Sequence, residues 1–303
     1  MISLFQFLNT YNYTVITSSP SSDCLIVIDK DSVGTLPLNK PTGLSFYNNE
    51  LYIGCKYEIW KYSLYKNENI LIPKQSWITG AIKIHDLAFS NELSFCNTWF
   101  NTISTLSPTN NFSNIYKPWF ISSINPGDKC HLNGLASNKG SLKYYSCFGI
   151  TDKKKGWKEF EQEAGIIVDI NTNKPVLHNL CLPHSPRVYN DTLYFLESSL
   201  GTLNKKDGFK KEVIIKLPNF IRGLFLIDNF AFVCGSKFRH IHNKSIDSYS
   251  CIYVVDIYTG ELITELKFDD VEELFDIQVL CQNNAPSLVK YNSLDIDRIF
   301  SFN

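Results

Sequence analysis

The sequence has almost no helical periodicity. The one stretch with amphipathic helical spacing is 157–164, in a chain of 303 residues. Parallel α/β folds need a crossover helix between consecutive strands, so a fold of that kind is disfavoured. No apolar run approaches the roughly 20 residues needed to span a bilayer, and the N-terminus lacks the basic region of a signal peptide. We therefore expect a soluble, cytoplasmic protein without a membrane partner.

Several catalytic and metal-binding motifs are also missing. There is no GxGxxG or Walker motif and no GxSxG elbow, which argues against nucleotide-binding folds and against a serine hydrolase. The nine cysteines are odd in number and form no CxxC pair, so neither a zinc finger nor a disulfide framework is indicated. Several lie in apolar, strand-like runs, where a free cysteine acts as a small hydrophobic residue. This pattern is typical of a reducing compartment.

Charge of one sign is not in excess. Lys and Arg total 29, Asp and Glu total 30, and the formal net charge is −1. An electrostatic footprint for nucleic acid or for an anionic membrane is therefore not expected. The remaining partner classes are a small-molecule ligand or a partner protein.

The sequence is rich in short β-strand patterns. Aromatic residues make up 14% of the chain, and aromatic and β-branched residues favour strands. One example is a strand at 43–46, a turn at Asn48-Asn49, and strands at 51–55 and 58–62. Strands joined by tight turns in this way predict an antiparallel meander.

The meander repeats along the chain. One position of the repeat is occupied by Gly43, Asp86, Gly134, Pro186, Gly223 and Asp276, at intervals of 43, 48, 52, 37 and 53 residues. Periods of 40–50 residues with three or four strands each are typical of propeller blades. We predict an all-β, six-bladed β-propeller in a single domain, 1–303, with seven blades as the alternative. The predicted blades are 41–83, 84–128, 129–182, 183–219, 220–272, and 273–303 joined with 1–40.

The last predicted blade is made from both ends of the chain. Only its first strand, near 274–281, follows the final repeat, and the strands within 13–30 have no blade of their own. Completing the last blade with these N-terminal strands closes the ring and removes open sheet edges.

Polar side chains precede the first strand of each blade. The first strand of a propeller blade is innermost, so these residues are expected to converge on one central funnel. Three of the six histidines, His85, His131 and His184, occupy such positions. Imidazoles from adjacent blades could bind a divalent transition metal such as Zn, Mn, Fe or Ni, and an arginine could hold a carboxylate or phosphate. Alternatively, each histidine simply bonds a neighbouring backbone carbonyl.

Three sets of candidate site residues follow. The candidate catalytic residues are His131, His184, Arg187, Arg222 and Glu273, the candidate metal ligands are His85, His131 and His184, and the candidate cofactor-binding residues are Asn97, Asn133, Lys237 and Arg239.

The sequence also resembles an uncharacterised, mainly bacterial β-propeller family, a domain of unknown function. The matching motifs are Asn97-Thr98, Cys130 to Ala136, Pro183 to Arg187, Arg222-Gly223-Leu224 and Ser236-Lys237 with Arg239. The chain departs from the family pattern at Trp99 and Asn101, where a basic and a small residue are expected. The resemblance implies a propeller but no reaction.

Two functional hypotheses remain. In the first, the funnel holds a ligand or metal and performs metal-assisted hydrolase, lyase or isomerase chemistry on a small anionic or carbohydrate-like substrate. In the second, the protein is a non-catalytic interaction module. A propeller supports both, so the fold leaves open whether the protein is an enzyme.

Overall fold

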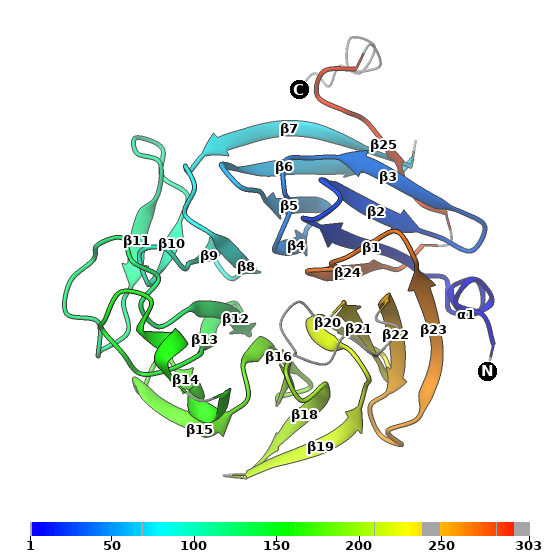
Figure 1. Ribbon diagram of the computed structural model, residues 1–303. Helices are drawn as coiled ribbons and strands as arrows, with labels where there is room; N and C mark the ends of the chain where they lie inside the picture. The colour runs from blue at the N-terminus through cyan, green and yellow to red at the C-terminus, as the bar shows by residue number, and fades with distance from the viewer. Residues whose placement is uncertain are drawn as a thin grey trace.

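The computed structural model describes residues 2–67, 69–160, 162–208, 210–237, 249–282 and 284–293. Within these residues, six sheets are arranged in a ring around a central axis (Figure 1). The predicted six-bladed β-propeller is therefore confirmed, and the seven-bladed alternative is wrong.

Five blades are built from consecutive strands that run antiparallel from the axis outward. Their strands, blade by blade, are β4 (Leu44–Tyr47), β5 (Glu50–Gly54), β6 (Glu58–Tyr65) and β7 (Ile70–Ile78); β8 (Ile84–Phe89), β9 (Leu93–Asn97), β10 (Thr102–Thr105) and β11 (Ser113–Tyr116); β12 (Leu132–Asn138), β13 (Ser141–Cys147), β14 (Gly165–Asp169) and β15 (Lys174–Leu180); β16 (Pro183–Tyr189), β17 (Thr192–Glu197), β18 (Thr202–Asp207) and β19 (Lys210–Lys216); and β20 (Phe220–Ile227), β21 (Phe230–Ser236), β22 (Ser250–Asp256) and β23 (Leu262–Phe268). Two-residue turns join many of these strands. Asn48 and Asn49 both have positive φ, as the turn between β4 and β5 requires.

The sixth blade closes the ring as predicted. It runs in the order β24 (Ile277–Leu280), β1 (Thr14–Ser19), β2 (Cys24–Ile28) and β3 (Val33–Pro37). Val15 pairs with Val279, and Thr17 pairs with Ile277. Because β1 pairs with both β24 and β2, β1 is not left as an open edge.

The hydrophobic core lies between neighbouring blades. Strands buried on both faces, such as β2 and β21, are almost continuously apolar because each sheet is covered on two sides. Helix α1 (Leu4–Tyr11), which the sequence pattern did not predict, covers the seam between the closing blade and β20–β23. A capping box between Ser3 and Gln6 starts this helix, and Phe7 packs edge-on against Phe230.

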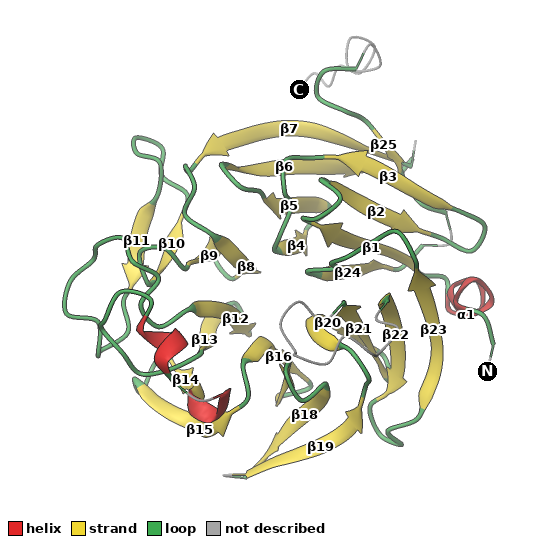
Figure 2. Cartoon of the chain, in the orientation of Figure 1, coloured by secondary structure: helices red, strands yellow, loops and turns green. Residues whose placement is uncertain are grey.

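The remaining short elements lie outside the blades. The helical stretch expected at 157–164 is instead two 3₁₀ helices, η1 (Gly156–Glu159) and η2 (Gln162–Ala164), shown in red in Figure 2. Strand β25 (Ser287–Leu288) adds to the outer edge of β7 in parallel. None of the helices in the described ranges is both long and apolar enough to cross a bilayer. All nine cysteines fall in the described part of the chain and are free, and all but Cys281 are buried.

Candidate functional site

The inner strands β4, β8, β12, β16, β20 and β24 all run in the same direction along the axis. We call the end of the axis where they begin the entrance mouth, and the end where they finish the exit mouth. Near their starts, β8, β12, β16 and β20 each contain an irregularity in the pairing with the next strand, for example between His184 and Arg187. Bulges of this kind turn side chains out of the regular alternation and are frequent beside functional sites.

Seven side chains form a closed ring of contacts at the entrance mouth, which we call the mouth ring. In order, its members are Phe275, His85, His131, Phe148, His184, Phe220 and Arg222. Ring centroids lie 4.6 Å apart for His85 and His131 and 4.5 Å apart for His131 and Phe148. The Arg222 guanidinium closes the circuit 5.0 Å from the ring centre of Phe275. The predicted convergence of the three histidines and Arg222 therefore occurs in the structure.

Each histidine of the mouth ring has its Nδ1 held by the protein. Nδ1 of His85 lies 3.1 Å from the carbonyl oxygen of Lys83, and Nδ1 of His184 lies 3.1 Å from that of Leu182. Because a carbonyl can only accept, Nδ1 carries the proton in both rings. The hydroxyls of Thr98 and Ser198 occupy equivalent places beside these two Nδ1 atoms. In the neutral rings, Nε2 is therefore the hydrogen-bond acceptor.

His131 differs from the other two because a carboxylate holds it. Its Nδ1 lies 2.9 Å from Oδ1 of Asp128, whose Oδ2 is 2.9 Å from the Lys83 ammonium. Burial alone would raise the pKa of Asp128, but the hydrogen bonds from His131 and Lys83 outweigh burial and hold that pKa well below its usual range. Asp128 therefore remains an anion that fixes the orientation of the His131 ring.

Electrostatics keep His85 and His184 neutral. Burial, together with the neighbouring His131 and Arg222, lowers the pKa of His85 to about 3. Burial, and after it Arg222, also lowers the pKa of His184 well below its ordinary value. Arg222 is paired with Glu273 at 2.7 Å. Among the described residues, the fixed charges that contact the mouth ring include two pairs, Arg222 with Glu273 and Lys83 with Asp128.

His131 also lies against an insertion. Its ring contacts Trp157 of η1 at a centroid distance of 4.5 Å, and Trp157 contacts Phe148. Lys129 and Asp152 anchor this insertion through a salt bridge whose ammonium is almost fully buried. Asp128 and His131 both have positive φ, a conformation that is uncommon for residues other than glycine and that clusters at functional sites.

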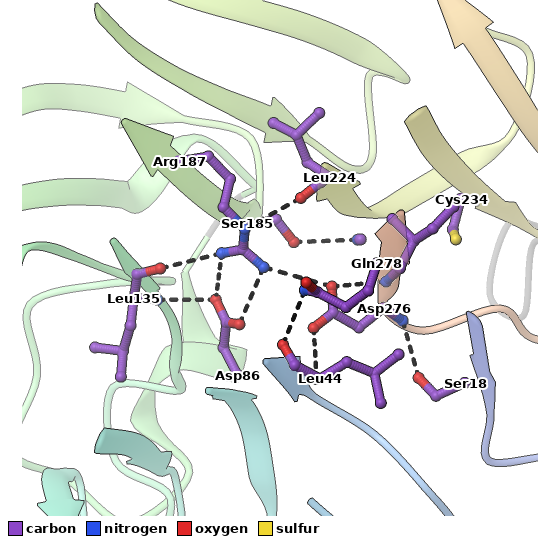
Figure 3. Close-up of polar contacts among 12 residues, drawn as sticks. Ser18, Leu44, Asp86, Leu135, Ser185, Arg187, Leu224, Cys234, Asp276 and Gln278 are labelled. Carbon is purple, nitrogen blue, oxygen red and sulfur yellow. Dashed lines mark hydrogen bonds and ion pairs between the residues drawn. The ribbon is translucent and has the colours of Figure 1, made fainter. Parts of the chain in front are cut away.

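Arg187 follows His184 along β16, and its side chain points between the inner strands toward Asp86 and Asp276 (Figure 3). Its guanidinium makes a bidentate contact with Asp86 at 2.8 and 3.1 Å and reaches Asp276 at 3.4 Å. It also donates to the carbonyls of Leu135 and Leu224. One side chain from β16 therefore connects to four other blades, and we call Asp86, Arg187 and Asp276 the axial triad.

The axial triad also ties inner strands to each other directly. Asp86 accepts a hydrogen bond from the Leu135 amide at 2.9 Å, and Asp276 accepts one from the Leu44 amide at 2.8 Å. Burial raises the pKa of Asp276 to about 7; the Arg187 charge opposes this increase and the Asp86 charge adds to it. Two carboxylates share one guanidinium here, so the second carboxylate is held less firmly in its ionised form.

The repeat position identified in the sequence has a packing role on the axis. A Cβ on Gly223 would lie 2.9 Å from the Asp276 backbone, and Gly223 has a φ of +72°. A Cβ on Gly134 would lie 2.3 Å from Pro186. Glycine alternates with a larger residue around the ring because neighbouring inner strands approach too closely for two side chains.

The candidate cofactor-binding residues are not part of the mouth ring. Asn97 is fully buried, bonds Ser104 and caps the amide of Phe100, so it stabilises a turn. Asn133 is buried near the axis and accepts from Ser146, while its Nδ2 has no partner among the described residues. Lys237 donates to the carbonyl of Asp269. Arg239 lies outside the described residues.

In the part of the chain that the structure describes, the three histidines are not grouped as a metal site. No group of three or more His, Cys, Asp or Glu side chains in the described ranges is placed to hold a metal ion. Phe148 contacts both His131 and His184, and the Nδ1 atoms are engaged by protein acceptors. The alternative interpretation of the sequence, in which a histidine bonds a nearby backbone carbonyl, describes His85 and His184.

Sequence reasoning missed the aromatic half of the mouth ring and its acid. Phe148 follows the end of β13, and Asp128 precedes His131 by three residues. The spacing of Asp128 from His131 was the available signal. The sequence around Phe148 gave no such signal, because this residue follows the second strand of its blade and does not lie at a blade start.

A family model described as "Domain of unknown function (DUF4915)" matches residues 2–289. The chain belongs to this family. No curated protein matches the sequence. The family assignment confirms the resemblance drawn from the motifs and adds no reaction.

Solved structures similar to this DUF4915 member include other proteins of very different sequence. A chain of a nidogen–laminin complex is 9% identical, has a TM-score of 0.62, and is aligned over 89% of this chain and 99% of that chain. Virginiamycin B lyase from Staphylococcus aureus is 10% identical (TM-score 0.46; 72% and 75% covered), and apo AztD from Citrobacter koseri is 11% identical (TM-score 0.46; 89% and 98% covered). At 9% identity, the similarity to the nidogen–laminin chain supports the propeller fold alone.

Proposed function

We propose that the mouth ring binds a small, uncharged, hydroxylated carbonyl compound of the carbohydrate type and that His131 removes a proton from it. The observation that carries this proposal is the Asp128–His131 pair within an aromatic ring of contacts. Proton transfer of this kind is isomerase or lyase chemistry. It differs from the metal-assisted chemistry expected from the sequence, because the three imidazoles are not grouped as ligands.

The ligand class follows from the charges, the hydrogen-bond acceptors and the aromatic faces of the mouth-ring side chains. His85 and His184 are neutral, and Arg222 is already paired with Glu273, so the mouth offers little net charge to an anion. The Nε2 atoms are hydrogen-bond acceptors for hydroxyl groups, and Phe148, Phe220 and Phe275 supply apolar faces. Sites that combine apolar walls with a few placed polar groups are typical of small-molecule binding.

The proposed step uses groups in named roles. Nε2 of His131 takes the proton from the carbon next to the carbonyl, while Asp128 stabilises the imidazolium that forms. The electron pair of the broken C–H bond moves to the carbonyl oxygen, giving an enolate. Arg222 is the cation of the ring that would stabilise this oxygen. For an isomerisation, the hydroxyl on the carbon that lost its proton gives its own proton to the enolate oxygen and becomes the new carbonyl, and the His131 imidazolium returns its proton to the former carbonyl carbon. For an elimination, the enolate re-forms the carbonyl as the β-hydroxyl leaves, and the proton on His131 converts that hydroxyl to water.

Deuterium exchange tests the proposal whichever product the reaction gives. The protein is incubated in D₂O with a panel of aldoses and ketoses, and wash-in of deuterium next to the carbonyl is followed by NMR. The corresponding alditols lack the carbonyl and should bind without exchanging. His131→Gln should slow exchange by at least about 100-fold, and Asp128→Asn should also slow it. His178→Gln, at an exposed histidine of β15, is the matched control.

Exchange that persists at the same rate in His131→Gln would rule out His131 as the base. A panel in which no sugar binds or exchanges would overturn the ligand class. Binding without exchange would retain the site as a binding site and remove the catalytic step.

One observation favours the second hypothesis, a protein-interaction module. Trp119, Ile124, Ile150 and Phe160 are each more than 40% exposed, and Asp152 ties their two loops together through Ser122 and Lys129. Exposed apolar side chains gathered on adjacent loops are typical of protein-binding surfaces. If this surface binds a partner, Trp119→Ser together with Ile124→Ser should abolish the interaction while leaving deuterium exchange unchanged.

A further inference from the structure

The exit mouth contains a cavity of about 420 Å³ on the side of the axial triad away from the mouth ring. All six inner strands contribute to its lining, which includes Phe46 and Tyr47 of β4, Phe89 of β8, Phe225 of β20 and Gln278 of β24. This volume falls in the range of small-molecule sites, roughly 300–1,000 Å³. The cavity plays no part in the chemistry proposed for the mouth ring.

The charged side chain in the lining of this cavity is already paired with other groups of the protein. Arg187 is the one side chain among the lining residues that carries a charge at neutral pH. Its Nε, Nη1 and Nη2 donate to Asp86, Asp276 and the carbonyls of Leu135 and Leu224. An anion would therefore find no guanidinium N–H without a partner, and a cation would find the Asp86 and Asp276 carboxylates already engaged by that guanidinium. Both observations disfavour a charged ligand.

The groups that remain available are aromatic faces and neutral polar atoms. Tyr47 stacks on Phe89 at 4.2 Å with an interplanar angle of 12°, and Tyr47 is 45% exposed. Gln278 donates its Nε2 to the Leu44 carbonyl, which leaves Oε1 without a partner among the described residues. Ser45 and Ser137 add hydroxyls to the lining. A flat aromatic surface in the same cavity as a hydrogen-bond acceptor matches a flat ligand that carries a donor.

We propose that the exit mouth is a second binding site, specific for an uncharged aromatic ring that bears a hydrogen-bond donor. The ring stacks on the Tyr47–Phe89 pair, and the donor group binds Oε1 of Gln278. This site is separate from the mouth ring and does not depend on the function proposed there.

Three probes of one shape test the charge requirement. Benzyl alcohol, benzoate and benzylammonium share a phenyl ring and differ in charge. In ligand-observed NMR, benzyl alcohol should bind at least about tenfold more tightly than either ion, because burying a charge without a free partner is costly. Equal or tighter binding of benzoate or benzylammonium, or no benzyl alcohol binding at millimolar concentration, would overturn the proposal.

Three variants test whether benzyl alcohol binds at the exit mouth. Tyr47→Ala should weaken benzyl alcohol binding about tenfold, as expected for loss of an aromatic stacking partner. Tyr258→Ala, which removes a tyrosine that is 68% exposed in the turn between β22 and β23, should leave it unchanged. Ser137→Trp, which fills the cavity from an accessible position, should abolish binding while the circular dichroism spectrum stays that of the wild type. Equal losses in Tyr47→Ala and Tyr258→Ala, or retained binding in Ser137→Trp, would contradict the assignment.

Discussion

The two mouths of this propeller are built from opposite ends of the same six strands and differ in chemistry. The entrance mouth gathers His85, His131, His184 and Arg222, beside bulges at the strand starts. The exit mouth lies past the irregularities at the strand starts, although β12 has a second one between Ala136 and Ser137. It holds a cavity with aromatic walls, and the charge of Arg187 in its lining is already paired. Titratable groups and open volume are thus separated along the axis. Four of the six inner strands have an irregularity near their starts, and the titratable side chains gather beside these four.

The axial triad stands between the mouths, and its removal should have the largest effect. Arg187→Met leaves the buried carboxylates of Asp86 and Asp276 without their cation, which should lower the free energy of unfolding by about 3–5 kcal/mol. Arg222→Met removes the cation from one carboxylate, that of Glu273, rather than from two, and should cost less, about 1–3 kcal/mol. Urea unfolding of both variants measures the difference. A smaller loss for Arg187→Met than for Arg222→Met would mean that the axial triad is not the main polar contact that holds the blades together.

The pH dependence of stability should have opposite signs at the triad and at the entrance mouth. The pKa of Asp276 is raised from its ordinary value of 3.8 to about 7, so the folded state holds a proton that the unfolded state releases. The stability of wild type relative to Asp276→Asn should therefore fall as the pH rises from about 4 to about 7.

For His184 the sign is reversed. Its pKa is lowered from the ordinary value of 6.5, so the unfolded state takes up the proton first. The stability of wild type relative to His184→Gln should be fully present above pH 6.5 and should fall as the pH drops below it. Thermal unfolding of the three proteins across this range measures both slopes. Parallel slopes in the two comparisons would contradict the stated electrostatics.

The smallest effect is expected at the rim of the exit mouth. Tyr47 is half-exposed and its stacking contact is with Phe89, so Tyr47→Ala should lower the free energy of unfolding by about 1 kcal/mol or less. Denaturant unfolding checks this value. A loss of several kcal/mol would show that the Tyr47–Phe89 contact is important for the stability of the whole propeller.

The inner half of the fold was predictable from sequence, and the outer half was not. Inner and middle strands such as β9 and β21 are wholly buried, so they appear as apolar runs between turn residues. Outer strands such as β3, β11 and β19 are largely exposed, and β19 is charged along much of its length. Their strand conformation comes from pairing with a neighbour, which leaves little trace in local hydrophobicity.

The candidate site was also predictable only in part: the residues at blade starts were, and those placed by contacts between blades were not. Blade starts placed His85, His131, His184 and Arg222 together because the repeat fixes the register of every inner strand. Arg187 was expected beside His184, but the bulge between them sends it along the axis to Asp86. Phe148 lies on no blade start, and its contact with two histidines depends on the lateral packing of neighbouring blades. Such contacts are tertiary and leave no periodic signal.

The closing blade also has a consequence for how the chain folds. The bond from the Thr14 hydroxyl to the Gln282 carbonyl joins residues 268 positions apart, and the whole β1–β24 pairing is comparably remote. Contacts this distant carry a large loop-closure cost and favour slow folding. On a ribosome, five sheets would emerge before β24 is available, so β1 would wait with an unpaired edge. Ring closure is then the last step of folding, and the interval before it is when the nascent chain is most exposed to aggregation.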